Sequence, residues 1–289
     1  MISKNEKSYT KILIKNNIRI FLSDYTKVAN EILLKKQTSF ISKVILSSAI
    51  ATFGSLGFIL TKDGEVKISY VSKQLGSVID VIGTFDGKLR AKMLNNQIQD
   101  EDNFSEDFLS KSIDLSNIYL TPYIGEDAKL IVNVKDKISN YNSQVDVFKA
   151  DMISDLNYFF YQSFQIHSAI KKSIKFDEKN NLTKATSIIM QLLPNNKEDD
   201  IIFIEKFWKE NNFNDMSIEE VENKLEANLL ETKEVTFVCE CSYEKVVNML
   251  SSLSKENKKY LFENKDENIE VNCPFCESKY LIEKKIIEK

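Results

Sequence analysis

The residues of this chain best suited to chemistry are its four cysteines, which form two close pairs near the C-terminus. One residue separates Cys239 from Cys241, two separate Cys273 from Cys276, and the remaining sequence contains no cysteine. Four thiolates in two short clusters are a common ligand set of a tetrahedral structural zinc site. The sequence therefore predicts that these sulfurs bind one zinc ion per chain while the thiols are reduced.

Short elements must position the two pairs. In an extended strand, residues i and i+2 project to the same side, so a strand over 237–241 would present both thiols of the first pair to one point. A tight turn is expected at the second pair, with a helix at 243–253, an apolar turn at 260–262 and a closing strand at 279–282. A unit of about fifty residues has a small core, and structural zinc supplies on the order of 10–16 kcal/mol of folding energy.

Three other interpretations of the cysteines compete with this one. The first is a purely structural zinc ribbon, which fits the spacing equally well. The second is a nucleic-acid-binding zinc module, which is disfavoured because residues 239–289 carry a net charge of −1. The third is a dithiol reductase with a Cys-Pro-Phe-Cys motif, but only 13 residues follow Cys276, too few for the helix and strands that this fold needs.

An acidic segment precedes the cysteines. Residues 196–238 contain 5 lysines and 12 acidic residues, a net charge of −7, whereas residues 1–195 carry +4. We expect two amphipathic helices here, one over about 199–211 and one that begins at Ser217 with a Ser-x-x-Glu capping box. Too small to fold alone, they should dock on the body. The candidates for docking or for client binding are Ile201, Ile204, Phe207, Trp208, Ile218, Val221, Leu225 and Leu229.

The first 195 residues mix strand and helix patterns without a regular βαβ repeat. Alternating apolar residues predict strands at 18–22, 66–70, 77–82, 88–94, 117–121, 129–134, 144–149 and finally 184–193. Helices are expected at about 24–36, 40–60 and 150–169. Residues 98–114 are expected to form an acidic surface excursion, that is, a segment outside the regular helices and strands. The predicted fold class is α+β: a mixed-sheet core with packed helices (1–195), a helical linker (196–234) and a small C-terminal zinc-binding domain (235–289).

The sequence also indicates where in the cell the protein is expected and whether it is an enzyme. The polar N-terminus does not resemble a signal peptide, and the apolar stretch 44–60 is short for a membrane span and contains four Ser or Thr residues, so a buried core helix is favoured. We expect a cytoplasmic protein whose cysteines meet a reducing environment. His167, the only histidine, is interpreted as a surface or packing residue, Trp208 as a buried docking anchor, and no enzyme active site is predicted.

The cysteine spacing at the C-terminus of a 33.4-kDa chain resembles that of the 33-kilodalton heat-shock protein family, the redox-regulated cytosolic chaperones. Gln191-Leu-Leu-Pro194 is similar to the Gln-x-x-Pro of that family, and residues 159–165 are similar to its Tyr-Phe-x-x-Ser-Glu-Gln helix, with Phe164 in place of Glu. Asp63-Gly64 lies where that family has an early turn, and Arg90 lies where it has an arginine on a strand. Residues 185–187 (Ala-Thr-Ser) and Glu277 depart from it, because the family often has glycine there.

The resemblance implies a mechanism. Oxidation would join Cys239 to Cys241 and Cys273 to Cys276, release zinc and unfold the C-terminal domain. The linker would then undock, and the protein would bind unfolding proteins as a holdase, as a homodimer, without nucleic acid or membrane as a partner. The competing hypothesis is an α+β binding protein whose zinc ribbon is purely structural.

Overall fold

The computed structural model describes residues 7–74, 78–98, 113–116, 120–137, 140–147, 151–262 and 267–287. Its internal contacts divide the chain into two compact units, Met1–Phe237 and Val238–Lys289. The larger unit combines a sheet with several helices, and the smaller one contains all four cysteines, so the predicted α+β class is confirmed.

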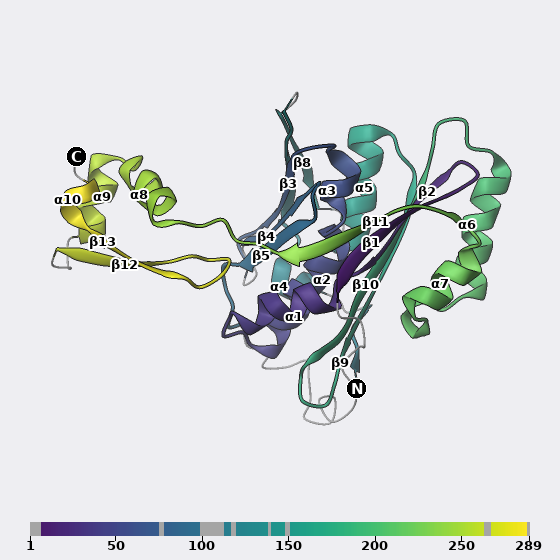
Figure 1. Ribbon diagram of the computed structural model, residues 1–289, viewed down its shortest axis with the longest axis horizontal. Coiled ribbons are helices and arrows are strands. Elements are labelled where there is room, and N and C mark those ends of the chain that lie inside the picture. Colours follow the sequence, from purple (N-terminus) through teal and green to yellow (C-terminus); the bar gives the residue numbers. More distant parts are fainter. Residues whose placement is uncertain are drawn as a thin grey trace. The chain divides into compact units, whose positions relative to one another are not determined.

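Among the described residues of the larger unit, eleven strands form one sheet in the order β6-β9-β10-β2-β1-β11-β5-β4-β3-β7-β8 (Figure 1). Neighbouring strands are antiparallel except for β11 and β5, which are parallel. The strands are β1 Ser8–Lys15, β2 Ile18–Asp24, β3 Glu65–Val71, β4 Val78–Thr84, β5 Lys88–Met93, β6 Ile113–Asp114, β7 Lys129–Lys135, β8 Asn140–Asp146, β9 Ser168–Phe176, β10 Leu182–Leu192 and β11 Asn228–Phe237.

The main core contains most of the helices of the larger unit. These helices are α1 Thr26–Leu34, α2 Phe40–Phe53, α3 Leu56–Leu60, α4 Thr121–Ile124 and α5 Met152–Phe164. Helix α2 contacts β9 and β10 as well as β4 and β5, so it links the two halves of the sheet. The stretch Phe40–Leu60 is long and apolar enough to cross a membrane, but 83% of its most apolar window is buried, as predicted for a core helix.

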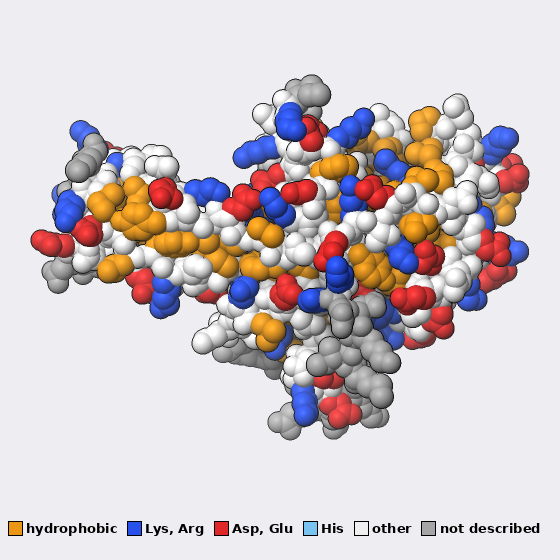
Figure 2. Space-filling view, viewed as in Figure 1, with side chains coloured by type: hydrophobic (Ala, Val, Ile, Leu, Met, Phe, Trp, Pro, Cys, Tyr) orange, Lys and Arg blue, Asp and Glu red, His pale blue; other side chains and the backbone are white. Residues whose placement is uncertain are grey.

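A second core lies on the other face of β1, β2 and β10. Ile18, Ile20 and Leu22 of β2 point into it, whereas Phe21 points into the main core, as strand alternation requires. Helices α6 (Glu198–Glu210) and α7 (Ile218–Leu225), joined through the 3-10 turn η2 (Phe213–Asp215), cover this face. In Figure 2, acidic and basic side chains cover the surface that α6 and α7 form.

The capping box predicted at the start of α7 is present. The Ser217 hydroxyl accepts a hydrogen bond from the Glu220 N–H at 3.2 Å, and the Glu220 carboxylate accepts one from the Ser217 N–H at 2.7 Å. The bond from the Ser217 N–H to the carboxylate, together with the interaction of that carboxylate with the Ser217 hydroxyl, lowers the pKa of Glu220. The sequence pattern therefore located this helix start correctly.

The prediction of helix through Leu229 is wrong. Helix α7 ends at Leu225, and residues 228–237 form β11, which pairs with β1 and continues the sheet. The apolar stripe of α7 suggested a longer helix because Leu229 lies four residues after Leu225. Glu226, with φ +47, breaks the helix before that point.

Other sequence predictions also differ from the structure. Strand β1 was not predicted, and Thr121 begins helix α4 where a strand over 117–121 was expected. The strand expected at 144–149 is β8, which ends at Asp146. The strand at 184–193 is not the last of the sheet, because β11 follows it. Most of the proposed excursion at 98–114 lies outside the described residues.

The smaller unit contains three helices and a two-stranded sheet in its described part. They are α8 Tyr243–Ser251, α9 Lys255–Phe262, β12 Asn268–Asn272, β13 Lys279–Glu283 and α10 Lys284–Ile287. The turn predicted at 260–262 is the end of α9. The core consists of Val246, Leu250, Phe262, Ile269, Ile282 and Ile287. Six buried apolar side chains make a very small core for a separate unit.

Candidate metal centre

The first cysteine pair lies between β11 and α8. The predicted strand over 237–241 is too long, because β11 ends at Phe237 and both cysteines follow it. Helix α8 begins directly after the pair, and its N-cap Ser242 accepts a hydrogen bond from the Lys245 N–H. The Lys245 ammonium also donates to the Glu240 carbonyl oxygen at 2.6 Å. The chain between the two thiols is thus tied to the first turn of α8.

The second pair lies on the turn between β12 and β13. The Cys273 N–H donates to the Ser278 carbonyl oxygen at 2.9 Å, and the Glu277 N–H donates to the Cys273 carbonyl oxygen at 2.9 Å. These bonds close the loop from both ends, as predicted for a C-x-x-C turn. Five paired residues on each strand hold the base of the turn.

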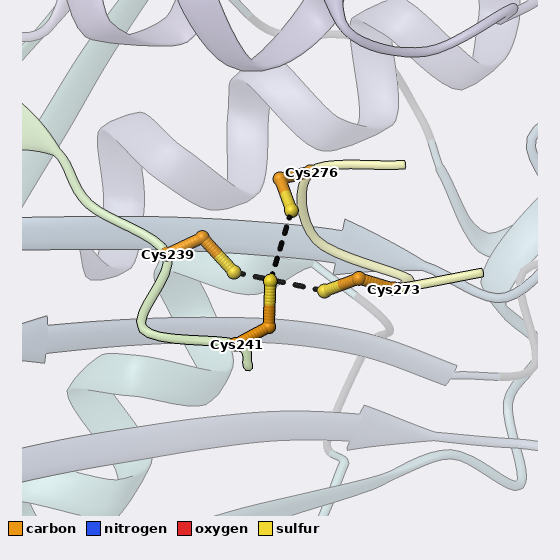
Figure 3. Close-up of side chains that lie close together, drawn as sticks. All are labelled: Cys239, Cys241, Cys273 and Cys276. Carbon is orange, nitrogen blue, oxygen red and sulfur yellow. Dashed lines mark hydrogen bonds between the residues drawn. The ribbon is translucent and has the colours of Figure 1, made fainter. Parts of the chain in front are cut away.

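The two pairs come together at one point. All four sulfur atoms lie within 4.8 Å of one another, with 3.6 Å between Cys239 and Cys273 and 3.3 Å between Cys241 and Cys276. Figure 3 shows the four side chains directed toward a common centre. A tetrahedral zinc site with Zn–S bonds of about 2.3 Å places its sulfurs about 3.8 Å apart. An all-thiolate set also favours zinc over hard cations, so these four residues fit a zinc ion.

The surroundings shift the pKa values of three of the thiols in different directions. Burial raises the pKa of Cys239 and of Cys273. Burial alone would also raise the pKa of Cys276, but hydrogen bonds with the Ser278 side chain and backbone and with the neighbouring cysteines lower it to about 6. Of these three thiols, Cys276 is therefore the one whose protein environment most favours the thiolate.

Tyr280 is a neighbour of the site that the sequence did not reveal. Its hydroxyl donates to the Cys241 sulfur at 3.0 Å, and this bond raises the pKa of Tyr280 to about 12. The Ser278 hydroxyl lies 3.2 Å from the Cys276 sulfur. Both residues follow the second pair closely in sequence, but no spacing rule links them to a particular sulfur. Hydrogen bonds of this kind orient metal ligands.

Comparisons with known proteins agree with this arrangement. The family model described as Hsp33 protein matches residues 8–283, which is almost the whole chain. The chain belongs to the Hsp33 family. This confirms the resemblance that the cysteine spacing suggested, and it makes the protein a member of a chaperone family.

Individual Hsp33 relatives match over nearly their full length. The 33 kDa chaperonins of Streptococcus pneumoniae strains JJA and Hungary19A-6 are each 24% identical over 285 residues, covering 94% of this chain and 93% of the relative. The crystal structure of the 33 kDa chaperonin of Thermotoga maritima matches with a TM-score of 0.79 at 19% identity, covering 97% of this chain and 96% of that one. This last match shows a shared fold.

The structure places most of the linker candidates in the second core. Ile204, Phe207, Ile218, Val221 and Leu225 are buried there. Trp208 is only partly buried, with its ring 5.2 Å from that of Phe207 and with the Lys171 ammonium 4.8 Å from its ring centre. Ile201 and Leu229 are 42% and 50% exposed. Phe207 thus anchors α6 more deeply than Trp208 does.

The only histidine lies outside the metal centre. His167 follows α5, and its ring is 5.3 Å from that of Tyr161. Within the described residues, the four cysteines alone form a group of histidine, cysteine or acidic side chains close enough to share one metal ion.

Glu277 occupies a backbone conformation that favours glycine. Its φ is +62°, in the left-handed region, which costs an L-residue about 1–2 kcal/mol. We expect Glu277→Gly to relieve this strain and to raise metal affinity by roughly fivefold, or about 1 kcal/mol. Competition with a chromogenic chelator measures the change. Lys259→Gly, at an exposed position of α9, is the control and should leave affinity equal or lower. Equal or weaker binding by Glu277→Gly would contradict the assignment of strain.

Proposed function

We propose that this protein is a redox-regulated holdase chaperone, active when its cysteines are oxidised and inactive when they are reduced. The observation that carries the proposal is that strand β11 connects the four-thiol centre to the linker helices along the chain. A four-thiol centre begins two residues after β11, and β11 follows a helical segment that covers an apolar sheet face. Membership of the Hsp33 family supports the chaperone part of this function.

In the reduced state the four thiolates would hold one zinc ion. Bound zinc supplies the folding energy that the six-residue core of the C-terminal unit lacks. The linker helices meanwhile keep the second core covered. Six of its buried residues belong to the sheet, namely Leu13, Ile18, Ile20, Leu22, Ile188 and Met190. Unfolded polypeptides therefore have no access to this surface.

Oxidation by a peroxide or hypochlorous acid would change the thiols. With hydrogen peroxide, one thiol becomes a sulfenic acid as one water is released, and a second thiol then displaces the hydroxyl as another water, leaving a disulfide. We propose the pairs Cys239–Cys241 and Cys273–Cys276, so two oxidant molecules form two disulfides. Peptide mapping of the oxidised protein by mass spectrometry tests this pairing.

Oxidation would first unfold the C-terminal unit and then release the linker that precedes it in the chain. Disulfide sulfurs no longer offer thiolate ligands, and the remaining core is too small to keep residues 238–289 folded. The linker would then leave the sheet, exposing the apolar residues of both. We propose that unfolding cytoplasmic proteins bind there, and that the oxidised protein is a homodimer. The proposal involves no nucleic acid, no membrane and no enzymatic step.

The test combines metal release with chaperone activity. Zinc-loaded protein is treated with hypochlorous acid or warm peroxide, zinc is followed with a chromogenic chelator, and aggregation of a chemically unfolded client is followed by light scattering. We expect zinc release and suppression of aggregation to rise together, and a thiol reductant with zinc to reverse both. Release of zinc without suppression would instead favour the α+β binding protein with a purely structural zinc ribbon.

A further inference from the structure

Strand β11 occupies an unusual position in the sheet. It lies between β1 and β5, and it pairs with β1 from Ser8↔Val235 to Ile14↔Asn228 (Figure 1). Its pairing with β5 extends over only two residues, Thr236 and Phe237. Strand β1 has β2 on its other side. Among the described strands, β11 alone therefore covers this edge of β1.

The backbone provides most of the attachment between β11 and β1. The side chains of residues 228–232 are all exposed, including Leu229 at 50% and Leu230 at 62%, whereas Val235 is buried in the main core. A register shift between Ile12 and Leu13 leaves Leu230 without a partner residue on β1. Pairing that depends on backbone hydrogen bonds is tolerant of sequence, so other extended segments can take the same place.

The ends of β11 adjoin the segments that the proposed activation would unfold. Glu226 and Ala227 alone separate it from α7, and Val238 alone separates it from Cys239. Its hydrogen-bonded backbone lies under exposed side chains along its first half, which is typical of the less stable parts of a fold. Release of both neighbours would thus leave β11 held by its backbone pairing with β1 and by the side chains of its last few residues.

The edge of β1 that β11 covers can be identified residue by residue. The Thr236 N–H donates to the Gly87 carbonyl oxygen, away from β1. Because amides alternate along a strand, those of residues 231, 233 and 235 point toward β1. The opposite residues Ile12, Thr10 and Ser8 accordingly direct their amides toward β11. Departure of β11 would leave these groups unpaired at a sheet edge.

The uncovered edge is continuous with the uncovered apolar face. Leu13 of β1 is buried in the second core beneath the linker, and its partner on β11 is Leu229. An extended segment in the place of β11 would direct alternate side chains toward this same face. The site therefore fits extended, β-prone segments with alternating apolar residues, which unfolded proteins expose.

We propose that the activated protein binds its clients in part by β-strand addition to the edge of β1 that β11 leaves. This inference rests on the proposed function, because it concerns the state after oxidation. The client segment replaces β11 through backbone hydrogen bonds, and the neighbouring apolar face accommodates its alternate side chains. Binding would consequently depend on free backbone amides of the client and little on its sequence.

The experiment uses ten-residue peptides of sequence 228–237 and the oxidised full-length protein. One peptide is unmodified, a second is N-methylated at 231, 233 and 235, and a third, the matched control, is N-methylated at 232, 234 and 236. We expect the first and third to compete with an unfolded client and the second to compete at least about tenfold less well, since it lacks the amides that face β1. Equal competition by both methylated peptides would overturn the proposal.

Amide hydrogen exchange locates the binding. The amides of Ser8, Thr10 and Ile12 should be protected in the reduced protein and lose protection on oxidation. They should regain it with the unmodified peptide and with the control peptide, but not with the peptide methylated at 231, 233 and 235. Unchanged protection on oxidation would show that β11 stays in place, and a concentration-dependent return of protection without peptide would show that a second copy takes the edge. Each result would overturn the proposal. Suppression of client aggregation in the same samples reports separately on the proposed chaperone function.

Discussion

Replacement of Cys273 by serine is expected to weaken metal binding by roughly a hundred- to thousandfold and to destabilise the fold of residues 238–289. Cys273 is the most buried of the four cysteines, at 6% exposure. If structural zinc supplies about 10–16 kcal/mol through four ligands, loss of one ligand costs about 2.5–4 kcal/mol, or roughly a hundred- to thousandfold in affinity. The remaining core of six apolar residues cannot compensate for this loss.

Metal content and hydrogen exchange measure the effect of Cys273→Ser. The backbone amides of β12 and β13, which pair from Asn268↔Glu283 to Asn272↔Lys279, should lose their protection. The strands of Met1–Phe237 should keep theirs, apart from β11 and the edge of β1 that pairs with it. Ser251→Ala, an exposed position at the end of α8, is the control and should retain one zinc ion. A variant that binds zinc as tightly as the parent protein would remove Cys273 from the ligand set.

Replacement of Val221 by aspartate is expected to release the linker without oxidation. Val221 is fully buried in the second core, between the linker and the sheet. The change removes about 1.5–3 kcal/mol of apolar burial and adds the cost of burying a carboxylate, which is several kcal/mol. Undocking of α7 exposes the new charge to water and is the easiest way to avoid that cost. The variant should therefore suppress client aggregation while it is reduced and zinc-loaded.

Trp208, the only tryptophan, reports directly on this release. It is partly buried against Phe207 and Phe213, so its fluorescence should shift to longer wavelength when α6 leaves the sheet. The matched control is Asn223→Asp, which adds the same charge at an exposed position of the same helix. Zinc content should stay at one ion in both variants. Release of the linker without suppression of aggregation would show that the covered face does not bind clients.

The four-cysteine cluster was predictable because the information lies in residue types and short spacings. Two cysteine pairs with no cysteine elsewhere leave little choice of partner, and the structure brings all four sulfurs together. The start of α7 was equally predictable, since the capping box of Ser217 and Glu220 is a local interaction. The same holds for the buried residues of α6 and α7, whose spacing follows the helical period.

The sequence alone was thus sufficient to predict the grouping of the four cysteines, the amphipathic linker helices and the α+β class, because each depends on residue types and local pattern. Long-range pairing, by contrast, is the reason that residues 228–237 form a strand. The side chains of Leu229 and Leu230 are exposed, so no buried alternation marks them, and the strand exists through backbone pairing with residues more than 200 positions away. The contact of Tyr280 with Cys241 likewise arises only once the two cysteine pairs meet, because the two residues lie 39 positions apart.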